Sequence, residues 1–303
     1  MQSRFQLPAQ LFSFCVLALA GCDPPEADPA NAGEVVPLDR VDQLVAEARG
    51  RLEPTEGGRL VLRAIEAHGG LEAWYRAPTS SYTWEYANVG GDLRFKSFLV
   101  ADNLSRRIYH DLLTTGSFDD PDEVDARFAW DGREAWIHPA SVEQPNPRFW
   151  AISGYYFQQI PFVLADPGLH YERIPDEELD GVRFEMVRVF FEPGVGESPG
   201  DTYTLYVHPE TGLVRALRYT VSYGRDAAPG ADLPETLFYY DDLVTVDGLT
   251  VATAYRGYAF RDGQAGAFRN EAFADSISFR RPFDPARLVA PEGARFVPPP
   301  LEE

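Results

Sequence analysis

The chain has 303 residues and two cysteines, and its acidic side chains outnumber the basic ones to give a formal net charge of −20. This charge excludes nucleic acid, and an anionic membrane surface, as partners bound through the protein's own face. Two cysteines exclude a disulfide framework or a CxxC metal site, so the fold must depend on its hydrophobic core. The length is sufficient for one large core.

The first 21 residues have the layout of a bacterial export signal. Arg4 supplies a positive charge, and residues 11–20 form an apolar run shorter than the roughly 20 residues that cross a bilayer. The run ends in Leu-Ala-Gly-Cys, which resembles the lipobox of bacterial lipoproteins. This resemblance implies transfer of diacylglycerol to the Cys22 thiol, cleavage before Cys22 and acylation of its new amine, for example by palmitate. We expect a lipid-anchored envelope protein on the periplasmic side of the inner or outer membrane; the alternative is an ordinary secreted protein.

The composition changes twice after the lipobox. Residues 22–37 are rich in Pro, Ala, Asp and Glu without apolar periodicity, which is typical of a disordered tether. Residues 38–303 are expected to form a single domain. Its proline-rich tail, from about residue 282, is expected to be loose, with Leu288 and Val289 held against the body.

Helical patterns open the domain. Asp39 is expected to cap a helix that runs to Leu52, because apolar residues recur there at helical spacing. A second helix is expected after Thr55. It should break at His68 and the two glycines that follow, because each glycine inside a helix costs about 1 kcal/mol.

From Ser80 onward, strand-like runs alternate with Gly- and Asp-rich turns. Alternation with a period of two indicates antiparallel strands with one covered face, and we expect the row that contains Phe273 to be covered and the row that contains Ala274 to be the wetter one. An aromatic insertion at 146–166 interrupts the strands. It predicts a helix over 148–159 that lies across the sheet and ends near Pro161. The expected class is α+β, with a long antiparallel sheet.

Sequence motifs give no support for catalysis. The five histidines are dispersed, and no metal-binding spacing, nucleophile elbow or nucleotide loop is found. We therefore predict a non-enzymatic protein without a metal or cofactor. His68 is the strongest functional candidate among the histidines, since it lies in the helix break; the alternative is a helix-end residue that bonds nearby carbonyls.

Aromatic residues are the more informative feature. A curved sheet with a helix across it encloses a concave apolar face, a usual place for ligands. Ordinary core packing is the alternative interpretation of each side chain. The candidate ligand-lining residues are Trp84, Trp136, Trp150, Tyr155, Tyr156, Phe157 and Phe162.

Several segments resemble a known superfamily. Residues 64–74 (AIEAHGGLEAW) are similar to the start of envelope proteins of the LolA, LolB and RseB type, the lipoprotein-carrier superfamily. Residues 206–214 resemble a hairpin common in those sheets. Residues 247–251 resemble a later strand entry, with Ala252 in place of the usual proline. Residues 160–168 are similar to a stretch in DUF6503-type proteins. The resemblance implies an unclosed β-barrel, that is, a strongly curved antiparallel sheet with helices over its concave face. In the carriers this face holds acyl chains.

Three functions stay open at this stage. The first is non-catalytic binding of an acyl chain, a lipoprotein or another apolar ligand in the concave face. The second is a scaffold or partner-binding domain without a small-molecule ligand. The third, an envelope hydrolase, has the least support because nucleophile and metal motifs are missing.

Overall fold

The computed structural model describes residues 36–300, apart from 197, 199 and 226–232. The export signal, Cys22 and the predicted tether up to residue 35 lie outside the described residues. The described helices are α1 (Leu38–Leu52), α2 (Glu56–Ala67), α3 (Gly70–Arg76), α4 (Pro147–Gln159), η2 (Phe162–Ala165) and η3 (Pro285–Leu288).

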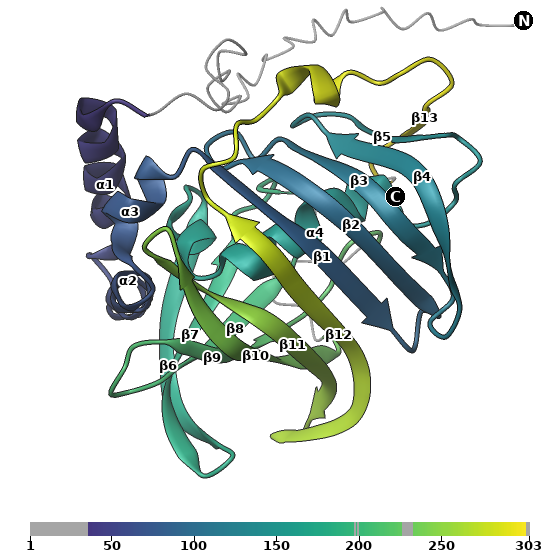
Figure 1. Ribbon diagram of the computed structural model, residues 1–303. Helices are drawn as coiled ribbons and strands as arrows, with labels where there is room; N and C mark the ends of the chain where they lie inside the picture. Colours follow the sequence, from purple (N-terminus) through teal and green to yellow (C-terminus); the bar gives the residue numbers. More distant parts are fainter. Residues whose placement is uncertain (1–35, 197, 199, 226–232, 301–303) are drawn as a thin grey trace, which may run out of the picture.

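The strands of the described chain form one curved antiparallel sheet (Figure 1). Their order is β13-β5-β4-β3-β2-β1-β12-β11-β10-β9-β8-β7-β6, and the two outer strands, β13 and β6, do not pair with each other. The curl is therefore unclosed, and the predicted α+β half-barrel is confirmed. The strands are β1 (Thr79–Asn88), β2 (Leu93–Asp102), β3 (Ile108–Gly116), β4 (Pro121–Trp130), β5 (Ala135–His138), β6 (Leu169–Leu179), β7 (Val182–Phe191), β8 (Thr202–Val207), β9 (Val214–Tyr219), β10 (Glu235–Val246), β11 (Leu249–Arg261), β12 (Gln264–Ser278) and β13 (Arg295–Val297).

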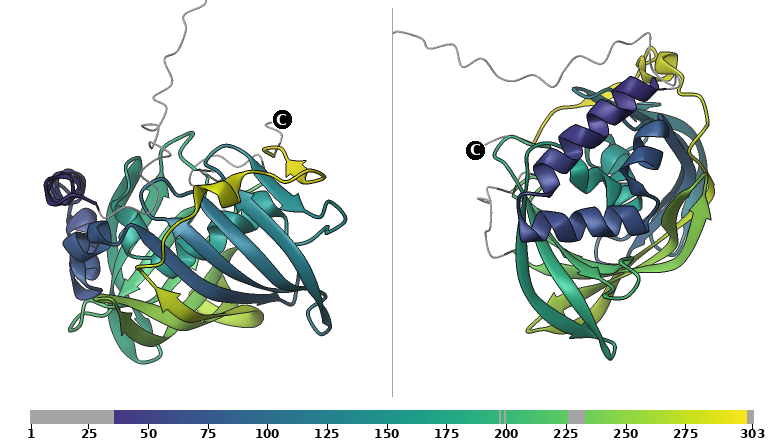
Figure 2. Two further views of the ribbon diagram at one scale, coloured as in Figure 1. Left: turned by 45° about the horizontal axis from the view of Figure 1, so that its top comes forward. Right: turned by 90° about the vertical axis from the view of Figure 1, so that its left-hand side faces the viewer.

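The three N-terminal helices lie across one end of the curl (Figure 2). The cap predicted at Asp39 is wrong: α1 already begins at Leu38 without a side-chain cap, and Asp39 lies in its first turn. A carboxylate there still interacts favourably with the positive end of the helix dipole. Thr55 caps α2, since its Oγ1 accepts a hydrogen bond from the Gly58 N–H at 2.9 Å. The predicted break is confirmed, with Gly69 at a φ of 127°, a conformation that suits glycine.

Helix α4 confirms the predicted insertion and lies inside the curl (Figure 2). Asn146 caps it by accepting a hydrogen bond from the Arg148 N–H at 3.0 Å. Gly154 sets how closely α4 approaches the sheet, because a Cβ at this position would lie 2.9 Å from Nε1 of Trp84. Any larger residue there would push the helix away from β1.

Strand β12 alternates as predicted, but in its middle part the opposite row of side chains is covered. Phe273 is 46% exposed on the outer face, whereas Ala272 and Ala274 are buried on the concave face. The expectation is therefore wrong for Phe273. It is right for Phe279, which is buried in the core, and for Ile277, which packs against it, because the register between β12 and β1 shifts near Ser276, where φ is 56°. Trp84 pairs with Ala274 across the β1–β12 seam, and its indole together with α4 occupies the hollow. Only small side chains of β12 fit beneath them.

The C-terminal tail is more ordered than expected. It runs over the outer face of the sheet, forms η3, and adds β13 to the edge of β5 (Figure 1). Leu288 is buried as predicted, but Val289 is 73% exposed, so its predicted contact is wrong. Leu288 contributes both its side chain and its carbonyl, which accepts a hydrogen bond from Nε1 of Trp136 at 2.7 Å.

Candidate functional site

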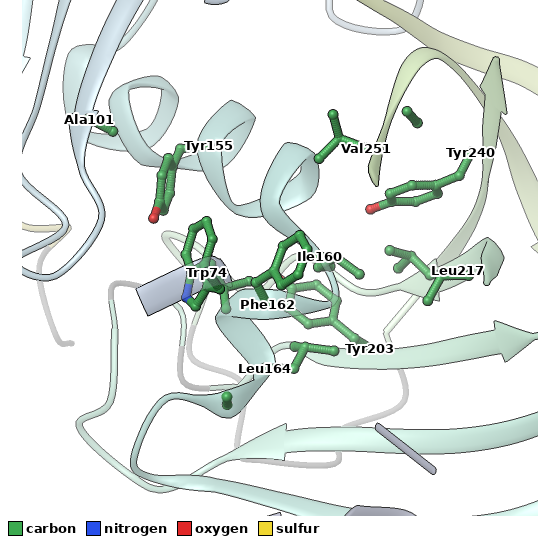
Figure 3. Packing of buried hydrophobic residues seen from close by; sticks show 14 of the residues in the cluster. Trp74, Ala101, Tyr155, Ile160, Phe162, Leu164, Tyr203, Leu217, Tyr240 and Val251 are labelled. Carbon is green, nitrogen blue, oxygen red and sulfur yellow. The ribbon is translucent and has the colours of Figure 1, made fainter. Parts of the chain in front are cut away.

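The concave face of the half-barrel is filled with large side chains. They form one continuous buried cluster to which α3, α4, η2 and the sheet all contribute (Figure 3). Hollows of about 340 and 420 Å³ lie elsewhere, one beside the tail and one between the β6–β7 turn, the β8–β9 turn and strands β10 and β11. The largest members of the cluster are Trp74, Tyr82, Trp84, Phe95, Phe128, Tyr155, Phe162, Phe238, Tyr240, Tyr255 and Phe279.

Six of the seven predicted lining residues belong to this cluster or pack against it. Trp84, Tyr155 and Phe162 are buried within it; Trp150, Tyr156 and Phe157 are half-buried at its margin. Trp136 is the exception. It lies on the outer face, in a separate small cluster under the C-terminal tail. Alternation along the sequence could not predict which face of the sheet Trp136 occupies, because β5 has only four residues and its outer face is covered by a remote segment.

Aromatic contacts connect the helices to the sheet. Phe162 of η2 stacks on Trp74 of α3, with ring centroids 5.0 Å apart and an interplanar angle of 10°. Phe157 of α4 lies 4.7 Å from the ring of Tyr219. At the other end of α4, Trp150 lies 4.4 Å from the ring of Tyr86. Such pairs each contribute about 0.5–1.5 kcal/mol beyond their buried area.

A polar network around Arg106 fixes α4 and η2 to the loop between β2 and β3. The guanidinium binds the Asp166 carboxylate through two nitrogens, at 2.5 and 3.1 Å, and donates to the Tyr155 hydroxyl at 2.7 Å. It also lies over the ring of Trp74. Burial alone would lower the pKa of Arg106, but Asp166 raises it above its ordinary value. The network therefore joins α3, α4, η2 and the sheet through one cation.

His68, the strongest histidine candidate, is a structural residue. Its Nδ1 lies 2.7 Å from the Thr250 carbonyl, and its Nε2 accepts a hydrogen bond from the Val214 N–H at 3.1 Å. Both ring nitrogens are used, which fixes a neutral tautomer with the proton on Nδ1. Burial lowers the pKa of His68 to about 4, and the bond to Thr250 opposes this shift. His110 is held in the same way, between Ser97 and the Ala151 carbonyl of α4, and burial lowers its pKa to about 3.

These two histidines predict a loss of stability in mild acid. A histidine of the unfolded chain has a pKa near 6.5, so the unfolded state takes up protons first as the pH falls. Their stabilisation is complete above pH 6.5 and is lost toward pH 4, with a slope of about 1 kcal/mol per pH unit for each ring. We expect urea unfolding of His68→Gln to depend less steeply on pH between 6.5 and 4 than that of the wild type. Equal slopes in His68→Gln and in the wild type would contradict the assignment.

The site contains polar residues that sequence patterns did not single out. Gln158 and Gln159, at the end of α4, are fully buried. Gln158 accepts a hydrogen bond from the Tyr255 hydroxyl and donates to the Ala252 carbonyl at 3.2 Å. Tyr82 could have been found, because Tyr82, Trp84 and Tyr86 alternate along one strand. Nothing in the local sequence marks the two glutamines as buried.

Neither a metal site nor a membrane-spanning helix is found in the part of the chain that the structure describes. No three His, Cys, Asp or Glu side chains there converge as ligands of one ion. The helices within residues 36–300 are all too short or too polar to cross a bilayer.

The fold of this chain is similar to that of solved LolA-type structures, as the resemblance in sequence implied. A scan against protein-family models finds no match, and a search of curated proteins finds none either. Among solved structures, the chain is similar to a DUF1329 family protein from Desulfovibrio piger, with a TM-score of 0.52 at 14% identity, covering 79% of this chain and 97% of that one. It is also similar to a LolA superfamily protein from Nitrosomonas europaea, with a TM-score of 0.51 at 10% identity, covering 78% and 98%. At such low identity, these likenesses concern the fold alone.

Proposed function

We propose that this protein is a lipid-anchored protein of the cell envelope that binds an acyl chain, or the acyl group of a lipoprotein, in the concave face of its half-barrel without catalysis. The single domain over residues 38–303 would be the binding domain, and Cys22 its anchor. The LolA-type fold and the export signal support this proposal. The acyl chain would lie between α4 and the sheet.

One observation carries the proposal: an extensive aromatic interior is covered by a single helix whose contact with the sheet includes unpaired polar atoms. Trp84 Nε1, Tyr82 Oη and both amide atoms of Gln159 are buried without a hydrogen-bond partner among the described residues. Each such group costs about 1–3 kcal/mol. The contact between α4 and β1 is thus weakened, while the apolar lining behind it matches a hydrocarbon chain.

Contact quenching of tryptophan fluorescence tests where the ligand lies. A dibrominated fatty acid added to the full chain carrying Cys22→Ser should quench the tryptophans of the concave face. Quenching should persist in Trp136→Phe, because that indole lies on the outer face, and should fall in Trp84→Phe and Trp150→Phe. If saturable quenching is lost only in Trp136→Phe, the ligand lies on the outer face. If the fatty acid does not quench the fluorescence of the folded wild type at all, the proposal is overturned.

The filled interior favours the second candidate, a partner-binding domain without a small-molecule ligand. In that case α4 stays in place as a core helix. Fatty acid would then leave the fluorescence unchanged, native mass spectrometry would show no lipid retained, and cross-linking in cells would capture a protein partner.

The anchor has its own test. Growth of the host with an alkyne analogue of palmitate should label the wild-type chain, because the lipobox directs acylation to Cys22. Cys22→Ser should abolish the label, whereas Cys15→Ser should keep it, since Cys15 lies in the segment that is removed. Label retained in Cys22→Ser would contradict the anchor without affecting the binding proposal.

A further inference from the structure

A hollow of about 420 Å³ lies on the outer face of the sheet, apart from the concave core. Its floor includes Phe184 of β7 and Tyr239 of β10, which belong to or pack against a second buried cluster on that face. Leu179 and Val182, on either side of the β6–β7 turn, extend the apolar lining. The volume is within the range of about 300–1,000 Å³ that small-ligand sites occupy. The hollow thus has the size and the apolar surface of a ligand site.

The walls of this hollow are held by contacts to the rest of the molecule. Gly212, in the β8–β9 turn, packs so closely on α2 that a Cβ there would lie 2.9 Å from Cβ of Ala67. Arg218 binds the Glu177 carboxylate through two nitrogens, at 3.0 and 3.1 Å, and this holds the end of the β6–β7 hairpin against β9. A hollow with fixed walls is formed before a ligand arrives, which lowers the entropic cost of binding.

Arg215 places a positive charge at the wall of the hollow. Tyr206 pairs with Ala216 and Val207 pairs with Val214, so Arg215 is the extra residue of a β-bulge. Bulges re-aim a side chain and are common beside functional sites. Arg215 is half-buried, and its guanidinium makes no hydrogen bond or ion pair with another described residue, although the net charge of the chain is −20.

The other charged groups of the hollow restrict the anion that Arg215 could bind. Asp241 is neutralised by Arg256, whose Nε lies 2.7 Å from its carboxylate. Asp180 is exposed at the rim and has no ion pair within the described part of the chain. Its charge repels a dianion, such as a phosphate, about twice as strongly as a monoanion. The hollow therefore favours a single negative charge.

A carboxylate meets this requirement and matches the donors at the wall. A guanidinium donates two parallel N–H bonds to the two oxygens of a carboxylate. His208 also lines the hollow, and its Nδ1 accepts a hydrogen bond from the Thr211 N–H at 3.3 Å. The proton of the neutral ring is therefore on Nε2, which is a second donor.

We propose that the outer-face hollow binds a small apolar carboxylate, such as an arylalkanoic acid, with its charge on Arg215 and its apolar body on Phe184 and Tyr239. The hollow is separate from the concave face, so this inference does not depend on the proposed acyl-chain site.

Two probes of nearly equal shape, 3-phenylpropanoate and 3-phenylpropanamide, test the role of the charge. Each is titrated calorimetrically into the full chain carrying Cys22→Ser, at neutral pH and low ionic strength. We expect the carboxylate to bind about tenfold more tightly than the amide, because a hydrogen bond to an ionised group is stronger than one to a neutral group. Arg215→Met should bring this ratio to about one.

Charge changes elsewhere provide the controls. Arg40→Met removes an exposed positive charge from α1 and should leave the ratio at its wild-type value. Asp180→Asn should strengthen binding of the carboxylate about twofold to threefold and leave the amide unchanged, because it removes a repelling charge from the rim.

Three results would overturn the site: no saturable binding to the folded wild type, equal binding of the two probes, or a preference for the carboxylate that survives in Arg215→Met. A loss in Arg40→Met as large as that in Arg215→Met would also overturn it, since overall charge would then explain the binding. Arg215→Met should fold, because it removes no bond within the described chain, and circular dichroism with urea unfolding verifies this.

Discussion

Phe162→Ala should lower the free energy of unfolding by about 3–5 kcal/mol, because it removes a buried ring and leaves a cavity that its neighbours cannot fill. The ring is fully buried, stacks on Trp74 at 5.0 Å and meets the edge of the His68 ring at 6.2 Å. It therefore holds the helices at the end of the curl to the segment after α4. Urea unfolding followed by circular dichroism measures the loss.

Phe273→Ala is the matched control for this prediction. It makes the same chemical change at a ring that is 46% exposed on the outer face. The expected effect is within about 0.5 kcal/mol. Comparable losses in the two variants would contradict the assignment of the concave side as the core.

Arg106→Met should cost about 2–4 kcal/mol and should loosen α4. The side chains of Arg106 and Asp166 are only 17% and 21% exposed, so removing the cation leaves a largely buried carboxylate unpaired. Tyr155 loses its contact with the guanidinium at the same time. Hydrogen exchange should become faster in α4 and η2, and the free energy of unfolding measures the total.

A surface ion pair provides the control for losing a positive charge at an exposed position. Arg49 and Glu66 are bonded at 2.6 Å but are 41% and 44% exposed. Arg49→Met should therefore cost less than about 1 kcal/mol. Adding Asp166→Asn to Arg106→Met should recover part of the loss, because the unpaired charge is removed. Additive losses in the double variant would show that the two side chains act independently.

Local sequence patterns predicted the helices and strands well. They predicted less well which face of each element is buried. The aromatic segment 146–166 is too long for one strand, and this predicted α4 to within one residue at its start. Alternation and short turns predicted an antiparallel sheet, and the half-barrel was implied by the resemblance to the lipoprotein-carrier superfamily. Alternation predicted the covered side of β12 at Phe279 but not at Phe273, since the register of the strand shifts near Ser276.

In the candidate site, too, the sequence predicted some features and missed others. Six of the predicted aromatic residues lie in or beside the concave core, because large apolar side chains in a curved sheet tend to share its core. Trp136 was misplaced because the segment covering it, near Leu288, lies far away in the sequence. Gln159 and Arg106 were missed because a polar residue carries no local sign of burial. The role of Arg106 depends on Asp166, the residue that follows η2.

The seam between β1 and β12 has a consequence for how the chain folds. Trp84 and Ala274 are neighbours in the sheet, although roughly 190 positions separate them, so their pairing contributes strongly to the contact order. Strands β1 to β5 can form a meander of local hairpins, as can β6 to β12. The first meander nevertheless keeps β1 as an unpaired edge until β12 has been synthesised. Folding should therefore be slow, and a chain that ends before β12 would expose the kind of edge that promotes aggregation.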